Sequence, residues 1–426
     1  MRHLPGGSWR KLRQHFLSKD NKLAIVFAHL TAMKTPVPKT APGALAVSLF
    51  VWVWLTLPSW ADSSEVTLFR TPDGGIQPQA AVDPAGAVHL IYFKGKPQGG
   101  DIFYVRREPG EREFSSPIRV NRQRGSAIAM GTVRGAQLAL GRKARVHVAW
   151  MGGEGASRVT IDGKEATPML YTRLNDAGTA FEPERNLITW AAGLDGGGSL
   201  AADSVGNVYV AWHASPPQNA KGEAGRAVFI ARSTDEGRTF ERERPANPKP
   251  TGACGCCGMR AFADSKGSVY LLYRAANEIS RDMTLLVSCD QAASFQLETV
   301  NQWTTKACPM STCAVAECNS GVAVATEREG QVCFNQVERG SLKLSQPTFT
   351  QGGEKCRHPT VAANSKGEIL LAWTEGTGWE KGGALAWQVF GQDGKPTSQR
   401  GRTDGVPVWG LPTAVGQSDG GFLIVY

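Results

Sequence analysis

The sequence lacks several features that define other classes of protein. Its longest uncharged apolar stretch, Ala44 to Leu57, has 14 residues, whereas a helix needs about 20 apolar residues to span a bilayer. It contains no G-x-x-x-x-G-K-[ST] segment, and its glycine pairs fall in hairpin-like segments instead of preceding helices. No long helix-forming stretch competes with its short alternating segments. These absences argue against a membrane-spanning helix, a nucleotide-binding loop of that type and an α-helical fold.

A large excess of charge is also missing once the N-terminal segment is set aside. The apolar stretch is followed by Ser59 and Ala61, small residues at the −3 and −1 positions of a cleavage site, which is typical of a secretory signal peptide. We expect residues 1–61 to be a leader, with Met33 as a plausible true start. This leader holds eight of the 47 basic and one of the 38 acidic residues, so residues 62–426 keep 39 and 37, a net charge of +2 instead of +9.

A nearly neutral mature chain argues against nucleic acid as a partner. The signal peptide predicts an exported protein, periplasmic or extracellular, with no stable membrane span after cleavage. The composition, 41% hydrophobic over 426 residues, excludes a disordered chain. We therefore expect one folded domain over residues 62–426, and a monomer.

One hairpin phrase recurs through residues 62–426. An apolar strand ends near Asp or Asn, a Gly follows three residues later, and an alternating strand then ends in an aromatic residue. The Gly suits a turn that needs positive φ, and the alternation buries one face of each strand. The clear copies span Ala81 to Tyr92, Ala202 to Trp212, Ala263 to Tyr273, Ala363 to Trp373 and Gly416 to Tyr426, and weaker copies end at Trp150 and near Thr326.

The spacing of these copies predicts a β-propeller. A period of about 47 to 62 residues leaves room for two further strands between copies, such as Ala227 to Arg232, and four strands per repeat are typical of a propeller blade. The prediction is an all-β propeller of four-stranded antiparallel blades, six or seven in number. Since the last copy stops after two strands, we expect Val66 to Arg70 to complete the closing blade.

A sharper motif occupies the turn between the third and fourth strands. The segment S-T-D-E-G-R-T-F, Ser233 to Phe240, matches the Asp-box, and degenerate copies occur 59 residues earlier and 55 residues later. The chain therefore resembles the sialidase superfamily of BNR or Asp-box propellers over nearly all of residues 66–426. In that family the motif is structural, because its Ser and Asp bond backbone amides and its aromatic residue packs inward. The structural Asp-box residues are Ser233, Asp235, Gly237, Phe240, Asp176 and Asp290.

The resemblance implies chemistry on a carboxylate-bearing sugar. It implies three arginines on the carboxylate, a tyrosine nucleophile activated by a glutamate, and an aspartate as acid or base. Arg134, Arg260 and Arg357 lie where inner strands begin, and Arg357 in C-R-H-P-T is a closer formal match to the family pattern than Arg70. We assign catalytic roles to Arg134, Arg260, Arg357 and Asp282, and substrate contacts to Arg274, Arg281 and Glu375.

The tyrosine nucleophile has no clear counterpart. Each of the seven tyrosines occupies either the repeat's aromatic position or the interior of a strand, where packing explains it. The leading hypothesis is an exported sialidase-like propeller that hydrolyses or binds anionic glycans at its central funnel, with a glycan or glycoprotein as partner. The alternative is a non-catalytic propeller that binds a protein or a glycan. We expect no cofactor.

All nine cysteines lie between Cys254 and Cys356. In an exported protein this predicts disulfides, with at least one thiol left over. The preferred reading is a bridge from Cys254, Cys256 or Cys257 to Cys308, Cys313 or Cys318. A copper or zinc site is a second reading, although C-x-C-C lacks the paired C-x-x-C spacing of structural zinc. A redox role for the adjacent Cys256 and Cys257 is a third. We assign no metal.

Overall fold

The computed structural model describes residues 65–426 except 132–134, 216–221, 340, 352 and 354. These residues belong to one compact unit, Trp60–Tyr426. The expected signal peptide, its cleavage after Ala61, the start at Met33 and the candidate Arg134 lie outside the described residues. The described part contains strands and three short 3-10 turns, η1 (Pro72–Gly74), η2 (Arg142–Ala144) and η3 (Glu223–Gly225), and none of its helices is long and apolar enough to cross a membrane.

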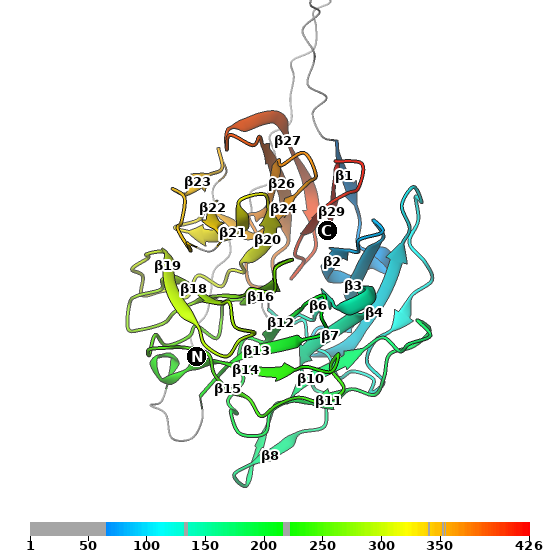
Figure 1. The fold of residues 1–426 in the computed structure, drawn as a ribbon, viewed down its shortest axis with the longest axis vertical. Coiled ribbons are helices and arrows are strands. Elements are labelled where there is room, and N and C mark those ends of the chain that lie inside the picture. The colour runs from blue at the N-terminus through cyan, green and yellow to red at the C-terminus, as the bar shows by residue number, and fades with distance from the viewer. Residues whose placement is uncertain (1–64, 132–134, 216–221, 340, 352, 354) are drawn as a thin grey trace, which may run out of the picture. The chain divides into compact units, whose positions relative to one another are not determined.

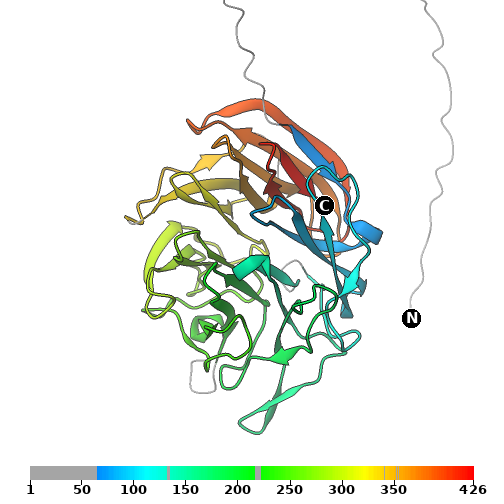
Figure 2. The same ribbon diagram turned by 45° about the vertical axis from the view of Figure 1, so that its right-hand side comes forward.

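The strands form seven sheets arranged as blades around a central axis (Figures 1 and 2). Blade 1 contains β2 (Ile76–Val82), β3 (Val88–Lys96), β4 (Gly99–Arg107) and β5 (Ile118–Arg119). Blade 2 contains β6 (Gln137–Leu140), β7 (Val146–Met151), β10 (Met169–Arg173) and β11 (Arg185–Asn186), with the hairpin of β8 (Val159–Ile161) and β9 (Lys164–Ala166) inserted. Blade 3 contains β12 (Gly198–Ala202), β13 (Val208–Ala214), β14 (Ala227–Ser233) and β15 (Arg244–Pro245).

The later blades repeat this antiparallel order. Blade 4 contains β16 (Arg260–Ala263), β17 (Val269–Arg274), β18 (Met283–Ser288) and β19 (Gln296–Asn301). Blade 5 contains β20 (Ala314–Cys318), β21 (Gly321–Arg328), β22 (Gln331–Glu338) and β23 (Thr348–Phe349). Blade 6 contains β24 (Cys356–Ala363), β25 (Ile369–Glu375), β26 (Gly383–Phe390) and β27 (Pro396–Val406). The propeller prediction is confirmed, and the number of blades is seven.

The seventh blade closes the ring with strands from both ends of the described chain. It consists of β28 (Thr413–Gly416), β29 (Phe422–Val425) and β1 (Val66–Phe69). The N-terminal segment thus completes the last blade as expected, but this blade has three strands instead of four, and β1 runs parallel to β29. Arg70 secures the closure, since its guanidinium donates to the carbonyl oxygens of Gly405 at 2.6 Å and Asp404 at 3.0 Å.

The repeated hairpins owe their shape to one acidic or amide side chain per turn. The carboxylate of Asp203 accepts the backbone N–H of Gly206 at 2.9 Å and of Asn207 at 2.8 Å. Asp83 and Asp264 accept amides of their own turns in the same way. Gly206 has φ of 105°, which a residue without Cβ adopts at low cost. The Asp and Gly of the repeated phrase are therefore turn residues, far from the strand starts.

The Asp-box turn of blade 3 is held by its own polar side chains. The Ser233 hydroxyl accepts the Gly237 N–H at 2.8 Å, and the Asp235 carboxylate accepts the Thr239 N–H at 2.9 Å. Phe240 packs edge-on against Tyr171 of blade 2, with ring centroids 4.8 Å apart. The motif thus joins one blade to its neighbour.

The related turns of blades 2 and 4 differ from each other. In blade 4, Asp290 accepts the N–H of Ser294 at 2.9 Å, as Asp235 accepts that of Thr239. In blade 2, Asn175 accepts the corresponding N–H of Ala180 at 3.4 Å and that of Thr179 at 3.0 Å, and Asp176 instead forms an ion pair with Arg145. Asp176 stands at the Asp position of the motif, but Asn175 accepts the hydrogen bonds that hold the turn.

The hydrophobic core lies between adjacent blades. Trp150 and Trp212, which end the second strands of blades 2 and 3, are at most 1% exposed. Apolar side chains of blades 2 and 3 form one such layer, and those of blades 3 and 4 form the next. Because the blade faces are covered, exposed chemistry is confined to the loops and to the axis. We call the end at which the innermost strands begin the entrance face.

Candidate functional site

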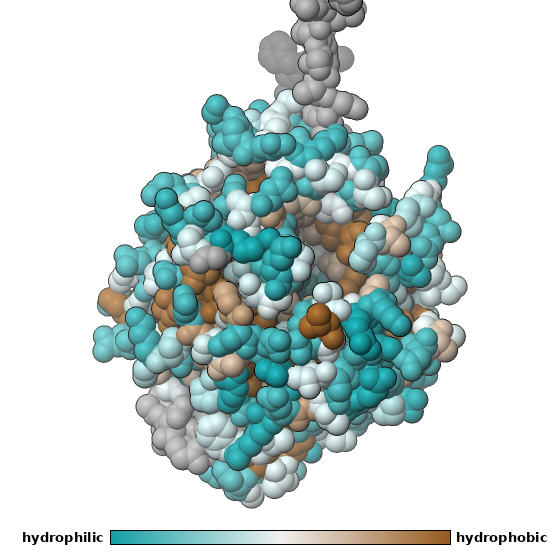
Figure 3. Space-filling model, in the orientation of Figure 1, coloured by the Kyte–Doolittle hydropathy of each residue, from teal (hydrophilic) through white to brown (hydrophobic). Residues whose placement is uncertain are grey.

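A channel runs along the axis, lined by the innermost strands β2, β6, β12, β16, β20, β24 and β28. Its cavity of about 370 Å³ has walls made largely of alanines, such as Ala201, Ala261 and Ala362. Small side chains are expected here because seven strands converge on a narrow axis. The face shown in Figure 3 is hydrophilic over most of its surface, with hydrophobic atoms in a hollow near its centre.

The mouth of the channel on the entrance face is polar. Arg260, the first residue of β16, donates through Nη1 to the side-chain oxygen of Gln137 at 2.6 Å and also to that of Gln79. These glutamines belong to blades 2 and 1, so the guanidinium reaches across the axis. Thr360 and Thr413 line the same mouth, and each hydroxyl accepts a backbone N–H from a neighbouring blade. The mouth is therefore a ring of hydrogen-bonding groups around one cation.

Arg260 has no carboxylate partner among the described residues, and its two side-chain hydrogen bonds go to neutral amides. Burial lowers the pKa of its guanidinium, which identifies a charge that is poorly solvated and not compensated by an acid. A desolvated guanidinium with spare donors is a suitable binding group for a carboxylate. Arg260 is therefore the residue of the channel mouth that is best suited to bind an anion.

An aromatic pair stands beside the mouth. Trp379, in the loop between β25 and β26, is 53% exposed, and its ring lies 5.8 Å from that of Trp409 in an edge-to-face arrangement. Trp409 belongs to the loop between β27 and β28, whose Leu411 and Pro412 line the channel mouth. Both loops lie on the entrance face. An exposed indole next to a polar opening offers an apolar surface on which a sugar ring can stack.

The other proposed substrate residues are engaged in structural contacts. Arg274 is 1% exposed and donates to the carbonyl oxygens of Arg281 and Glu327, both at 2.8 Å. Arg281 pairs with Glu223, Nη1 to Oε2, at 2.6 Å. Asp282 accepts the N–H of Trp303 at 2.9 Å and the Ser280 hydroxyl at 2.9 Å. These side chains form a wall beside the channel and do not converge on its mouth.

Two further candidates lie in blade 6. The carboxylate of Glu375 accepts from the Trp373 indole at 3.2 Å and from Arg402 at 2.9 Å. Arg357 starts β24 on the entrance face but is not among the residues lining the channel mouth. Burial raises the pKa of Glu327 and lowers that of His358, and the charge of Arg357 opposes the first shift and adds to the second. Among the described residues, the structure therefore places Arg260 at the channel mouth and does not bring Arg357 to it, while Arg134 lies outside the described residues.

No described tyrosine is activated as a nucleophile. Burial raises the pKa of the phenol in Tyr92, Tyr104, Tyr171, Tyr209, Tyr270 and Tyr273. Their hydroxyls bond to internal partners, as Tyr273 does with Asn247 at 2.7 Å. None of the seven lines the channel or its mouth. Tyrosine-based sialidase chemistry therefore has no nucleophile at the described part of this channel.

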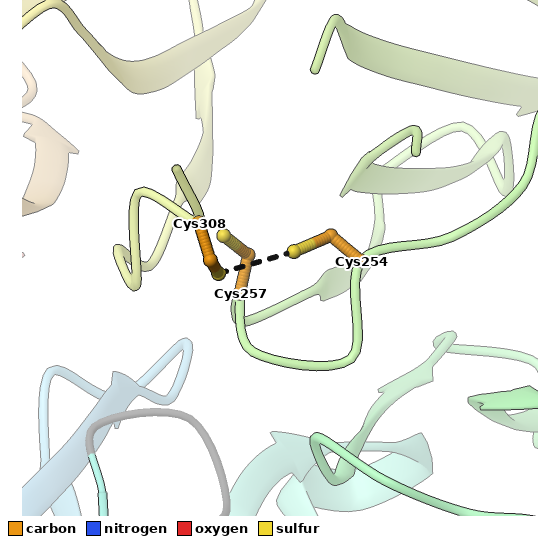
Figure 4. Close-up of side chains that lie close together, drawn as sticks. All are labelled: Cys254, Cys257 and Cys308. Carbon is orange, nitrogen blue, oxygen red and sulfur yellow. Dashed lines mark hydrogen bonds between the residues drawn. The ribbon is translucent and has the colours of Figure 1, made fainter. Parts of the chain in front are cut away.

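A second cluster of functional groups lies on the entrance face above blades 4 and 5. Cys254 and Cys257 come from the loop between β15 and β16, and Cys308 comes from the loop between β19 and β20. Their three Sγ atoms lie within 4.8 Å of one another, and Figure 4 shows them pointing toward a common centre. Burial raises the pKa of the Cys257 thiol, but the contacts with Cys254 and Cys308 and the charge of Arg274 outweigh it and lower that pKa.

No disulfide joins the nine cysteines, all of which lie within the described residues. Cys254 Sγ and Cys308 Sγ are 3.5 Å apart, which is a contact between thiols and not a bond. Cys313 is buried and donates to the carbonyl oxygens of Gly258 and Leu272 at 3.5 Å each. Cys318 lies beside the Ser320 hydroxyl at 3.4 Å. Cys254 and Cys308 are therefore neighbours, as expected, but they are not joined by a disulfide.

Sequence reasoning missed three parts of this arrangement. Cys254 and Cys257 are themselves a C-x-x-C pair with Cys256 as an intervening residue, so the third cysteine had concealed the spacing. Gln79 within β2 and Gln137 at the start of β6 gave no signal. Trp379 stands in a glycine-rich loop, T-G-W-E-K-G-G, in which an exposed aromatic residue could have been noticed.

Comparisons with known proteins found similarity to solved structures alone, all at low sequence identity. No family model matches the sequence, and no curated protein matches it. Similar solved structures include an α-L-arabinanase from Penicillium chrysogenum complexed with arabinobiose, at 13% identity, 78% coverage of this chain and 98% of that chain, and a TM-score of 0.49. The NanB sialidase from Streptococcus pneumoniae is 8% identical, with 72% of this chain and 67% of that chain covered and a TM-score of 0.47. The intramolecular trans-sialidase from Ruminococcus gnavus is 12% identical, with 80% of this chain and 88% of that chain covered and a TM-score of 0.40.

Proposed function

We propose that this protein binds an anionic saccharide at the mouth of its central channel, with the saccharide carboxylate on Arg260. The observation that carries the proposal is the half-buried Arg260 guanidinium, which meets only the amide oxygens of Gln79 and Gln137 among the described residues. A carboxylate would supply the opposite charge that this site lacks, and bidentate contact suits a guanidinium.

The remaining groups at the mouth fit a sugar. The amides of Gln79 and Gln137 and the hydroxyls of Thr360 and Thr413 can exchange hydrogen bonds with sugar hydroxyls. The exposed Trp379 supports stacking at the rim. In this proposal the protein is exported, as the N-terminal segment predicts, and meets glycans or glycoproteins outside the cytoplasm.

We propose binding without tyrosine-dependent turnover. The tyrosine hydroxyls are occupied in the blades, and Asp282 and Glu375 are held by other partners. Hydrolysis of a sialoside would need a nucleophile and an acid at the channel mouth, and the described residues offer neither there.

The test is calorimetric titration with sialic acid, glucuronic acid and galacturonic acid, each compared with its neutral hexose counterpart where one exists. At least one acid is expected to bind, and Arg260→Ala is expected to weaken that binding by about 30-fold or more, as loss of a charge-assisted pair implies. The matched control is Arg112→Ala, an exposed arginine of the loop after β4, which should change nothing. Equal binding by wild type and Arg260→Ala would reject the proposal.

A fluorogenic sialoside separates binding from catalysis. We expect it to compete for the site without being cleaved. Cleavage that depends on Arg260 would reject the non-catalytic part of the proposal while retaining the site. If no acidic saccharide binds and partners captured from the exported fraction are indifferent to Arg260→Ala, the alternative of a protein-binding propeller is favoured.

A further inference from the structure

The thiols of Cys254, Cys257 and Cys308 meet although Cys308 lies 51 positions after Cys257 in the sequence. Two of them are fully buried, with 0% and 1% exposure, and Cys308 is partly exposed. The three Sγ atoms all lie within 4.8 Å of each other. Nothing in the proposed saccharide site uses them, so the cluster needs an explanation of its own.

The separations between the sulfur atoms discriminate between two kinds of site. A disulfide requires about 2.05 Å between two sulfurs and would leave the third thiol unused. Three thiolates around one ion, each about 2.3 Å from it, stand roughly 4 Å from one another. The observed 3.5 Å between Cys254 and Cys308, with Cys257 within 4.8 Å of both, fits the second geometry.

Backbone hydrogen bonds hold the loop that carries two of the thiols. The N–H of Cys254 donates to the carbonyl oxygen of Arg274 at 2.9 Å, and that of Cys257 donates to the carbonyl oxygen of Cys254 at 3.4 Å. On the far side of the loop, the Gly258 N–H donates to the Ser311 carbonyl oxygen at 3.0 Å. The thiols are thus positioned by three segments of the fold before any ligand arrives.

The glycine of the C-G-C-C run lies directly against two charged side chains. A Cβ on Gly255 would lie 2.5 Å from Nη1 of Arg226 and 2.7 Å from a carboxylate oxygen of Asp195. Those two side chains form an ion pair at 3.0 Å. Gly255 therefore lets the loop that carries Cys254 and Cys257 pack closely on this ion pair.

Two arginines lie near the thiols, each beside a glutamate. The buried Arg274 reaches Glu327 at 3.7 Å, and Arg281 pairs with Glu223 at 2.6 Å. The charges of Arg274 and Arg281 both act on the thiols of the cluster. The exposed Cys256 and the carboxylate of Glu223 form a second group around Cys254, also within 4.8 Å. This group lies toward solvent and offers a path by which an ion can enter.

We propose that Cys254, Cys257 and Cys308 bind one Cu(I) ion as a trigonal set of thiolates. Soft sulfur ligands select Cu(I) or Zn(II), but structural zinc takes four protein ligands. Among the described residues, no fourth His, Cys, Asp or Glu lies within 4.8 Å of all three sulfur atoms, and the exposed Cys256 contacts Cys254 and Cys308 from outside this group. Cu(I) accepts three-coordinate sulfur. Binding deprotonates the three thiols and releases their protons to solvent, without a change in oxidation state.

The test uses the whole protein, reduced and kept anaerobic, titrated with Cu(I) against a chromophoric Cu(I) chelator. We expect one equivalent to bind and X-ray absorption to give three sulfur neighbours at about 2.3 Å. Cys254→Ser, Cys257→Ser and Cys308→Ser should each weaken binding by about 100-fold or more. The control is Cys289→Ser, an exposed cysteine next to Ser288 in the blade 4 turn, which should bind like wild type.

A second measurement needs no variant. Bound Cu(I) should protect Cys254, Cys257 and Cys308 of the wild-type protein from alkylation while Cys289 reacts at its usual rate. Failure to bind Cu(I) after reduction, or binding without protection of these three thiols, overturns the proposal. Preferential uptake of Zn(II) overturns the copper assignment. Saccharide binding by the Cys308→Ser variant serves as a folding check and is independent of the metal.

Discussion

Arg274 and Glu327 face each other inside the protein, with Nη2 3.7 Å from Oε2 and side chains only 1% and 2% exposed. The same Nη2 donates to the backbone carbonyl oxygen of Glu327 at 2.8 Å, and the guanidinium lies 5.0 Å from the centre of the Trp303 ring. The pair joins the second strands of blades 4 and 5 directly below the cysteine cluster. Burial raises the pKa of Glu327 to about 7 in spite of Arg274.

The first prediction concerns the pH dependence that Glu327 imposes on stability. The folded state keeps its proton up to about pH 7, whereas the unfolded state loses it near the ordinary value of 4.5. The free energy of unfolding therefore falls by about 3 kcal/mol as pH rises from 4.5 to 7, and this loss is complete above pH 7. Glu327→Gln, which cannot ionise, should lack this decline. Urea unfolding of both proteins at pH 5 and pH 8 measures it.

Glu113→Gln, at an exposed position of blade 1, is the control and should keep the wild-type slope. If wild type and Glu327→Gln lose stability equally between pH 5 and pH 8, Glu327 ionises normally in the folded protein and the prediction is wrong.

Three buried histidines lower the stability of the folded protein as pH falls. Burial lowers the pKa of His213 to about 4, and those of His147 and His358 to about 3, from an ordinary value of 6.5. Each contributes stability above pH 6.5 that is lost as pH falls toward 4, because only the unfolded chain takes up the proton. Neither ring nitrogen of His213 has a hydrogen-bond partner among the described residues.

His213→Leu should therefore lose less thermal stability between pH 7 and pH 5 than wild type does. The quantity to compare is the difference in Tm between the two pH values, since the substitution also changes packing at both. An unchanged difference would show that His213 does not stay neutral in the folded state.

Two glycines at the same position of the Asp-box frame give a matched stability test. Gly237 and Gly178 have φ of 78° and 69°. A Cβ on Gly237 would lie 1.7 Å from the Tyr171 hydroxyl oxygen, whereas a Cβ on Gly178 would meet nothing within 4 Å. Gly178→Ala should cost about 1 kcal/mol of backbone strain. Gly237→Ala should cost at least about 3 kcal/mol, because Tyr171 belongs to the packed neighbouring blade. Chemical denaturation of both variants decides, and equal costs would contradict the packing role of this turn.

The blades were accessible from sequence because each hairpin carries its own turn chemistry. Asp203 and Gly206 specify one turn with contacts only two to four residues away, and the same is true of Asp264 and Gly267. The channel mouth was not accessible in this way. Arg260 meets Gln79 and Gln137, which lie 181 and 123 residues earlier, and only closure of the ring brings them together.

The cysteine cluster shows an intermediate case. Its window and the neighbourhood of Cys254 and Cys308 follow from loops between consecutive blades, which the repeat had located. Which thiol points inward depends on loop conformation: Cys257 turns into the protein, whereas Cys256 next to it is exposed. Adjacent residues of one loop thus have different environments, and no pattern in C-G-C-C distinguishes them.

The last prediction concerns closure of the ring by β1. Arg70 ties this strand to blade 6 through the carbonyl oxygens of Gly405 and Asp404, and its guanidinium lies 4.1 Å from the centre of the Tyr426 ring. Replacement by Ala removes two charge-assisted hydrogen bonds and a cation–π contact, so Arg70→Ala should lower the free energy of unfolding by about 2 kcal/mol. Arg70→Lys should recover part of the loss, since an ammonium can still bond one carbonyl oxygen but lacks the planar fork.

Because β1 pairs only with β29 among the described strands, its release should precede global unfolding. Hydrogen exchange at Phe69 and Thr71, whose N–H groups face β29 and Tyr426, should therefore accelerate in Arg70→Ala more than exchange at Val148 in blade 2. Equal acceleration at both places would mean that the ring opens as a whole and that β1 is not its weakest closure.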